Sequence, residues 1–247
     1  MPDLSLVIPA FNEEMRLPAF LDASIAYLTK SGRSFEIIVV DDGSRDGTQA
    51  VVQQRASLVK EVRLLALDRN SGKGAAVRAG MLAATGDLRL FADADGATTM
   101  DELARLEAAL AAGADVAIGS REGKGTIVRA SAIRRFLGRW FNRAVRLGAL
   151  RGIRDTQCGF KLFKGGVAAK LFGMARESGF AFDVEILYLA RKLGHKVAEV
   201  PVNWTEIPGS KVRLLRDGFR MLVQVQRIRR RWRSGEYSAE SEEPRAE

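Results

Sequence analysis

The chain of 247 residues contains a single cysteine, Cys158, and a single histidine, His195. One cysteine cannot form a disulfide within the chain, which favours a reducing compartment, and one residue of each type cannot build a Cys/His zinc cluster. No apolar run approaches the roughly 18 residues of a membrane-spanning helix. The first residues, MPDLSLVIPAFNEE, lack the basic and apolar segments of a signal peptide. We therefore expect a cytoplasmic protein.

Positive charge is concentrated in two segments of the chain. The formal net charge is +9, and residues 121–155 hold ten basic side chains against two acidic ones. Residues 209–233 hold nine basic side chains against Asp217 alone, so the remainder of the chain is acidic overall. Such an asymmetry indicates binding to a nucleic acid or to an anionic membrane surface.

Short β-branched apolar runs alternate with helical patterns in the first half of the chain. The strands are predicted at residues 4–9, 35–42, 62–68, 88–95 and 114–120. The helices between them are predicted at residues 13–30, 46–58, 72–85 and 101–112. This alternation predicts an α/β fold with a mostly parallel sheet and helices on both of its faces. Ligands of such sheets bind at the carboxyl ends of the strands.

The second half of the chain is less regular. We expect a basic loop after residue 120, followed by elements at 131–150 (helix), 165–175 (helix), 196–204 (strand) and 211–233 (basic helix). The acidic, apolar-poor stretch 234–247 is predicted to be a disordered tail.

The segment LRLFADADGATT, residues 88–99, ends an apolar strand with two carboxylates. Asp93 and Asp95 are one residue apart, and alternate residues of an extended chain point the same way. Two like charges facing one point are unfavourable unless a cation joins them. Mg²⁺ and Mn²⁺ commonly use one or two carboxylates together with substrate phosphates, so we interpret this pair as a metal site. The alternative is a surface turn, since Gly96 follows.

Polar clusters also follow other predicted strands. In VIPAFNEE, Pro9 is expected to end the strand, and Asn12 can cap the next helix. In VVDDGSRDGT, Asp46 or Thr48 can cap a helix, although acids at a strand end can also bind a nucleobase or a ribose. In RNSGKGAAVRAG, the glycines around Lys73 are typical of a phosphate-binding loop, but the spacing fits neither the P-loop nor the dinucleotide pattern.

Taken together, the motifs LSLVIPAFNEE, IIVVDDGSRDGT, NSGKGAAVRAG, DADGAT and AIGSRE resemble the family 2 inverting glycosyltransferases. The further motifs DTQCGFKLF and GFAFDVEILYLA resemble most the branch that glucosylates dolichyl phosphate, with the mannose-transferring branch close to it. The resemblance implies the nucleotide-diphospho-sugar transferase (GT-A) fold. It also implies one domain over 1–233, with a nucleotide-sugar-binding half (1–120), an acceptor half (121–210) and a basic amphipathic helix (211–233).

The resemblance assigns residues to three sites. The nucleotide-sugar would contact Pro9, Ala10, Phe11, Glu13, Val40, Asp41, Asp42, Lys73, Asp93, Ala94, Asp95, Arg121, Gln157 and Lys211. Asp93 and Asp95 match the metal and ribose carboxylates, and the metal would be Mg²⁺ or Mn²⁺. The acceptor phosphate would contact Arg121, Ser131, Arg134 and Lys211. The catalytic candidates are Asp93, Asp95, Arg121 and Asp183, of which Asp183 lies near the base of relatives that use a hydroxyl acceptor.

The implied reaction transfers a hexose, glucose from UDP-glucose in the first place, to a polyprenyl or dolichyl phosphate with inversion. A phosphate monoester has a second pKa of about 6 and is already nucleophilic at neutral pH, so it needs cations rather than a base. On this hypothesis Asp183 is structural or orients hydroxyls and arginines. The alternatives are a GDP-mannose-dependent enzyme and a family 2 enzyme that acts on a glycan hydroxyl.

A lipid acceptor agrees with the two basic segments. Apolar residues among arginines at helical spacing, with Trp140 in the first segment and Trp232 in the second, are typical of helices at a membrane interface. We therefore expect peripheral association with the cytoplasmic face of a membrane. The alternatives are a core-facing helix with a solvated basic side, a contact between copies, and a nucleic-acid-binding protein, although strand-end carboxylates would repel a polyphosphate.

Overall fold

The fold was obtained as a computed structural model, which describes residues 1–123, 126–129, 150, 152–208 and 214–237. The strands are β1 (Leu4–Ala10), β2 (Phe35–Asp41), β3 (Val62–Ala66), β4 (Leu88–Ala92), β5 (Val116–Ser120), β6 (Val128–Arg129), β7 (Phe160–Lys164), β8 (Val197–Pro201) and β9 (Trp204–Thr205). The helices are α1 (Leu17–Lys30), α2 (Thr48–Ala56), α3 (Lys73–Ala83), the 3₁₀ turn η1 (Met100–Glu102), α4 (Leu103–Ala111), α6 (Gly165–Met174), α7 (Phe182–Lys192) and α8 (Leu214–Arg233). The helix predicted at 131–150 lies outside the described residues, apart from Leu150.

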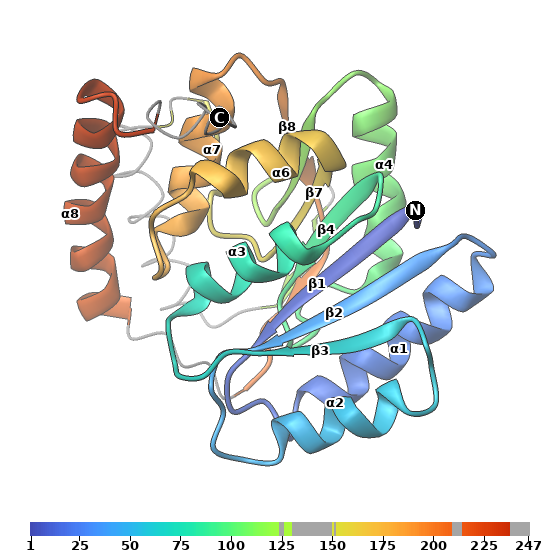
Figure 1. The fold of residues 1–247 in the computed structure, drawn as a ribbon. Helices are drawn as coiled ribbons and strands as arrows, with labels where there is room; N and C mark the ends of the chain where they lie inside the picture. The colour runs from blue at the N-terminus through green and yellow to red at the C-terminus, as the bar shows by residue number, and fades with distance from the viewer. Residues whose placement is uncertain (124–125, 130–149, 151, 209–213, 238–247) are drawn as a thin grey trace, which may run out of the picture.

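One seven-stranded sheet forms the centre of the molecule, in the order β3-β2-β1-β4-β7-β5-β8 (Figure 1). Every neighbouring pair is parallel except those of β7, which runs antiparallel to both β4 and β5. The predicted α/β class and the mostly parallel sheet are therefore confirmed. The antiparallel strand in the middle of the sheet has no counterpart among the predicted strands.

Two apolar cores cover the two faces of the sheet, because alternate residues of the buried strands point to opposite sides. Leu6 and Ile8 of β1 belong to the core under α1, α2 and α4. Val7 belongs to the core under α3, α6, α7 and α8. Figure 1 shows these two groups of helices on opposite sides of the strands.

Two predicted boundaries near the first strand are wrong. β1 continues through Pro9, which pairs with Val40 of β2. The ladder between β1 and β4 ends at Val7, so Pro9 takes part in one ladder only and its missing N–H is tolerated. The helix predicted from residue 13 begins at Leu17, with a proline in its first turn, where no N–H is needed.

The last described helix, α8, lies along the edge of the molecule beside α7 (Figure 1). Val225 and Ile228 of α8 are buried in the core that α7 lines, and the rings of Trp232 and Tyr188 lie 6.3 Å apart. This half of α8 is therefore a core-facing helix. Among the helices that the structure describes, none has the length and apolar character needed to cross a bilayer.

The predicted disorder from residue 234 is wrong for residues 234–237. Tyr237 is buried, its ring lies 6.4 Å from that of Trp232, and its hydroxyl donates a hydrogen bond of 2.5 Å to Glu185. An aromatic ring with a buried carboxylate partner holds the chain after α8 against the body of the protein. The remainder of the predicted tail, 238–247, lies outside the described residues.

Candidate active site

The acidic pair predicted to bind a metal lies at the carboxyl end of β4. The backbone N–H of Asp93 donates to the carbonyl of Gly159, at 2.9 Å, which brings the segment before β7 against the strand tip. A Cβ atom at Gly159 would overlap the Asp93 carboxylate, so only glycine leaves room for that side chain. Gly159 lies in the motif DTQCGFKLF, and the structure brings it into contact with Asp93.

Each carboxylate of the pair has a cationic neighbour. Lys73 Nζ lies 2.7 Å from an oxygen of Asp93, and a guanidinium nitrogen of Arg16 lies 3.9 Å from an oxygen of Asp95. Burial, and next the charge of Asp93, raises the pKa of Asp95 above its ordinary value. Negative charge thus gathers at this tip in spite of the two cations.

The donor set fits a divalent cation that arrives with further ligands. Asp93 and Asp95 keep 32% and 26% of their side chains exposed, so an ion can reach them. Among the described residues, no group of three or more His, Cys, Asp or Glu side chains is arranged to hold a metal. Two carboxylates completed by phosphate and water oxygens are a coordination that Mg²⁺ and Mn²⁺ accept.

A cavity of about 490 Å³ opens over the carboxyl ends of β1, β2 and β3. Its volume is within the range of small-molecule sites. Its lining consists of Phe11, Asn12, Gly43, Ser44, Arg45, Gln49, Leu67, Asp68, Arg69 and Asn70. Of the residues predicted to contact the nucleoside, Phe11 alone lines the cavity. Arg69 and Asn70 belong to the segment RNSGKGAAVRAG, whose glycines were interpreted as typical of a phosphate-binding loop, whereas Leu67 and Asp68 were predicted only as the end of a strand.

Asp41 and Asp42 are buried and shape the loops of the cavity. Asp41 accepts hydrogen bonds from the Ser44 N–H, at 3.1 Å, and from the Gln49 amide, at 2.7 Å. Asp42 accepts from the Ser71 and Gly72 N–H groups at 2.7 and 2.9 Å, and burial raises its pKa. Their predicted contact with a nucleoside stays a prediction.

Five more of the residues predicted to contact the nucleotide-sugar lie near the ends of the first strands. Glu13 receives two hydrogen bonds from the Arg16 guanidinium, at 2.7 and 2.5 Å, and its N–H donates to Thr48. Arg16, which the sequence interpretation missed, therefore connects Glu13 to Asp95; its position three residues after an acid on a turn was the only signal. Four predicted residues are buried small or apolar side chains, and they can meet a ligand mainly through their backbone: Pro9, Ala10, Val40 and Ala94.

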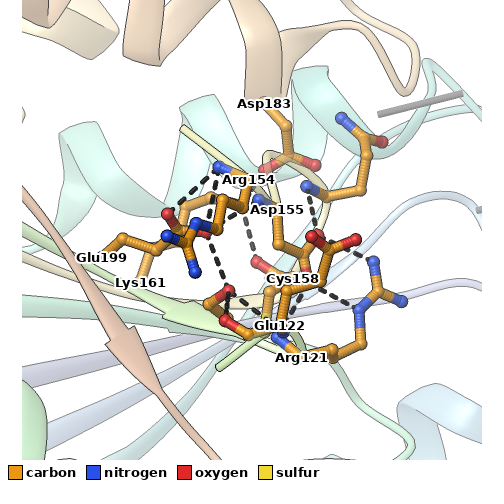
Figure 2. A network of polar contacts seen from close by, with 10 residues as sticks. Arg121, Glu122, Arg154, Asp155, Cys158, Lys161, Asp183 and Glu199 are labelled. Atoms are coloured by element: carbon orange, nitrogen blue, oxygen red, sulfur yellow. Dashed lines mark hydrogen bonds and ion pairs between the residues drawn. The ribbon is translucent and has the colours of Figure 1, made fainter. Parts of the chain in front are cut away.

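Arg121, at the end of β5, is held by Asp155 (Figure 2). The Arg121 Nε and Nη2 atoms donate to the two carboxylate oxygens at 2.7 and 2.9 Å, and the Arg121 N–H donates at 3.0 Å. Although burial alone would raise it, this guanidinium lowers the pKa of Asp155 to about 2. Glu199 in turn accepts from the Asp155 N–H at 2.8 Å.

Asp183, a predicted catalytic residue, is fully buried and forms an ion pair with Lys161 of β7. Burial raises the pKa of Asp183 in spite of this cation. Lys161 also donates to the carbonyl of Cys158 at 2.6 Å, and burial raises the pKa of the Cys158 thiol to about 12. Figure 2 shows Lys161, Asp183 and Asp155 in one network. Neither Asp183 nor Cys158 is available as a solvent-exposed base or nucleophile.

The Nε2 atom of Gln157 is buried and donates no hydrogen bond within the described part of the chain. A buried amide donor next to Asp155 agrees with its predicted contact to the donor sugar. Ser131, Arg134 and Lys211 lie outside the described residues, so their predicted contacts with phosphate stay predictions.

The fold matches that of solved nucleotide-sugar enzymes. A crystal structure of glucosyl-3-phosphoglycerate synthase from Mycobacterium tuberculosis, in complex with Mn²⁺ and UDP-glucose, superposes with a TM-score of 0.66. It is 20% identical in sequence, and the match covers 92% of this chain and 77% of that chain. The fold is therefore the GT-A type of α/β fold.

The family follows from the sequence. The profile described as Glycosyl transferase family 2 matches residues 5–172. A protein of Drosophila melanogaster called Dolichyl-phosphate beta-glucosyltransferase is 46% identical over 225 residues, which cover 85% of this chain and 69% of that protein. A protein of Dictyostelium discoideum with the same name is 39% identical over 252 residues, 96% of this chain and 77% of that protein. The chain belongs to glycosyltransferase family 2, and the resemblance found in its motifs is confirmed.

Proposed function

We propose that the protein transfers glucose from UDP-glucose to the phosphate of a dolichyl or polyprenyl lipid, with inversion at the sugar. The names of the relatives from Drosophila and Dictyostelium support the reaction. One structural observation carries the choice of acceptor. Arg121 is presented at the site by a buried carboxylate, while Asp183, the candidate base, is committed to Lys161. A phosphate acceptor needs such a cation and no base.

The donor occupies the carboxyl ends of β1 to β4 in this proposal. Its base and ribose enter the cavity beside Phe11, and its diphosphate lies towards Lys73 and the acidic pair. Asp93 and Asp95 hold Mg²⁺ or Mn²⁺, which when bound supplies Lewis-acid stabilisation of the departing nucleoside diphosphate.

The acceptor phosphate lies on the Arg121 side of the site. Asp155 binds Nε and Nη2 of Arg121, and the Nη1 edge of the guanidinium binds the phosphate and orients it towards the sugar. Gln157 donates to a hydroxyl of the sugar from its buried Nε2. Ser131, Arg134 and Lys211 supply further phosphate contacts.

The test offers the purified protein a panel of nucleotide-sugars with a short polyprenyl phosphate, with and without Mg²⁺ or Mn²⁺. We expect an acid-labile lipid-linked hexose from UDP-glucose that requires the metal. The control is the D22N variant, because Asp22 is an exposed carboxylate that is paired with Arg55 and does not line the cavity. If product forms from GDP-mannose alone, UDP-glucose is not the donor. If no donor gives a product, the proposed transfer to a lipid phosphate is rejected.

The lipid acceptor places the enzyme at a membrane surface. Arg227, Arg230 and Arg233 of α8 are exposed, whereas Val225 and Ile228 face the core and are not available to a bilayer. Attachment through this part of the helix is therefore electrostatic. Cosedimentation with vesicles should require anionic lipid and weaken with salt, and equal binding to neutral vesicles would contradict this arrangement.

A further inference from the structure

Lys73 is the cation in direct contact with the metal-binding pair. Its ammonium group lies 2.7 Å from an Asp93 oxygen, and 23% of its side chain is exposed. An ammonium group and a metal ion cannot both occupy this side of Asp93 without strong repulsion between like charges. The arrangement raises the question of how Lys73 responds when a metal binds.

The backbone of Lys73 is fixed from both sides. The N–H groups of Ser71 and Gly72 donate to Asp42, and the Ala75 N–H donates to the carbonyl of Ser178 at 3.2 Å. Gly72 has a φ of +99°, and a Cβ atom there would lie 2.5 Å from the same carbonyl. The loop cannot withdraw, so Lys73 can leave Asp93 only by moving its side chain.

The ammonium group has further attractive neighbours in its present position. It lies 5.4 Å from the centre of the Phe91 ring, and Lys161 Nζ lies 5.6 Å from the same ring. Asp183, the partner of Lys161, also attracts Lys73 electrostatically. A donor diphosphate beside Asp93 would provide a stronger partner than either.

We propose that Lys73 is an exchangeable counter-ion that occupies the place of the metal at Asp93 until a nucleoside diphosphate gives it a new partner. Metal alone therefore binds weakly, whereas metal and nucleotide bind together, because the nucleotide removes the competing ammonium. This inference rests on the proposed function, since it assumes that the acidic pair binds a metal with a nucleotide-sugar.

The test measures Mn²⁺ binding by electron paramagnetic resonance, first without nucleotide and then with saturating UDP. In the K73M variant we expect Mn²⁺ alone to bind roughly tenfold more tightly than in the wild type, and the enhancement by UDP to fall by a similar factor, within the usual range of coupling between two ligands. The K73R variant, which keeps the charge, should retain weak binding of Mn²⁺ alone. The K60M variant is the matched control, because Lys60 has a 91% exposed side chain.

The outcomes separate the two proposals. If K73M and a second neutral variant, K73Q, bind Mn²⁺ alone no more tightly than the wild type, Lys73 does not compete with the metal and the inference is overturned. Thermal unfolding of each variant shows whether the protein under test is folded, and K73Q replaces K73M if the latter is not. If the wild type binds neither UDP nor UDP-glucose with any metal, the proposed function itself fails.

Discussion

Asp93 and Asp95, at the tip of β4, keep 32% and 26% of their side chains exposed, whereas Asp155 and Asp183 keep 1% and 3%. All four carboxylates have a basic partner. On the donor side the partners are Lys73 and Arg16, and on the acceptor side they are Arg121 and Lys161. The two halves of the site therefore contain similar ion pairs in different surroundings.

The different burial of the donor-side and acceptor-side ion pairs determines whether each pair can separate. Separating a buried pair leaves an uncompensated charge out of water, which is strongly unfavourable, so the acceptor-side pairs hold their geometry. A partly exposed pair can be hydrated when its partner leaves, so the donor-side pairs can exchange a side-chain cation for a ligand. The donor half is arranged for exchange and the acceptor half for positioning.

The largest effect is expected from removing a donor-side charge. D93N should lower turnover by roughly 10²–10³-fold, the loss typical of removing a group that stabilises developing charge, and D95N should behave similarly. Both variants should remain folded, since their side chains are partly exposed. Initial rates with UDP-glucose and polyprenyl phosphate provide the measurement. A loss of less than tenfold in D93N would remove Asp93 from the metal site.

The next largest effect is expected on the free energy of unfolding, when the acceptor-side carboxylate Asp155 is replaced. D155N should lower the free energy of unfolding by about 3 kcal/mol, because it leaves the Arg121 guanidinium without its anion. D115N is the matched control: Asp115 pairs with Lys164 at 2.8 Å on the surface, and its loss should cost less than about 1 kcal/mol. Urea unfolding compares the two. Equal costs would show that the burial of Asp155 makes no difference.

The pH dependence of stability should sharpen the same contrast. The pKa of Asp155 is lowered to about 2 in the folded protein, below the value of about 3.9 expected when it is unfolded. Its ionised form therefore stabilises the fold above about pH 4, and this contribution is lost as pH falls towards 2. The difference in unfolding free energy between wild type and D155N should shrink over that interval. A difference that stays constant would contradict the assignment.

A smaller effect on turnover is expected from D183N. A general base contributes about 10²–10⁴-fold, whereas a buried partner of Lys161 that positions the site should change the rate by less than about tenfold per folded molecule. The measurement is kcat normalised to the folded fraction from circular dichroism. A fall of a hundredfold or more in folded protein with intact UDP-glucose binding would restore Asp183 as the base.

The smallest effect is expected from Tyr237, which was not assigned to either half of the site. Y237F removes the hydroxyl that donates to Glu185 and should cost about 1 kcal/mol of stability with turnover unchanged. Thermal unfolding and an activity assay check the two parts. No change in stability would mean that the hydrogen bond from Tyr237 to Glu185 does not stabilise the fold.

The sequence was most informative where one local rule decides the structure. An apolar run followed by two carboxylates predicted that Asp93 and Asp95 lie at the tip of a strand. The strand predicted over residues 88–95 ends at Ala92, however, so the two carboxylates lie in the turn that follows and not in an extended chain. β7 was missed because FKLFK is short and lacks a regular alternation of apolar and polar residues, and because its Lys161 is buried by a partner from a distant helix. An antiparallel strand inserted between β4 and β5 cannot be inferred from a local pattern.

The partners of the predicted residues could not be predicted either. Asp155 stood within a quoted motif but was noted only as a charge, and its bond to Arg121 joins residues 34 positions apart. Arg16 lies in a turn that resembled the start of a helix. Such pairs depend on which loops meet at the edge of the sheet, and this is set by the packing of the whole chain.

The most direct test of the account compares two acceptors of equal chain length, polyprenyl phosphate and polyprenol, with UDP-glucose and Mg²⁺. A site with a fixed arginine and no available base should glucosylate the phosphate and leave the alcohol unchanged, giving an acid-labile product. Transfer to the alcohol at a comparable rate would contradict the account, because a hydroxyl must lose a proton and Asp183, the candidate base, is buried and paired with Lys161.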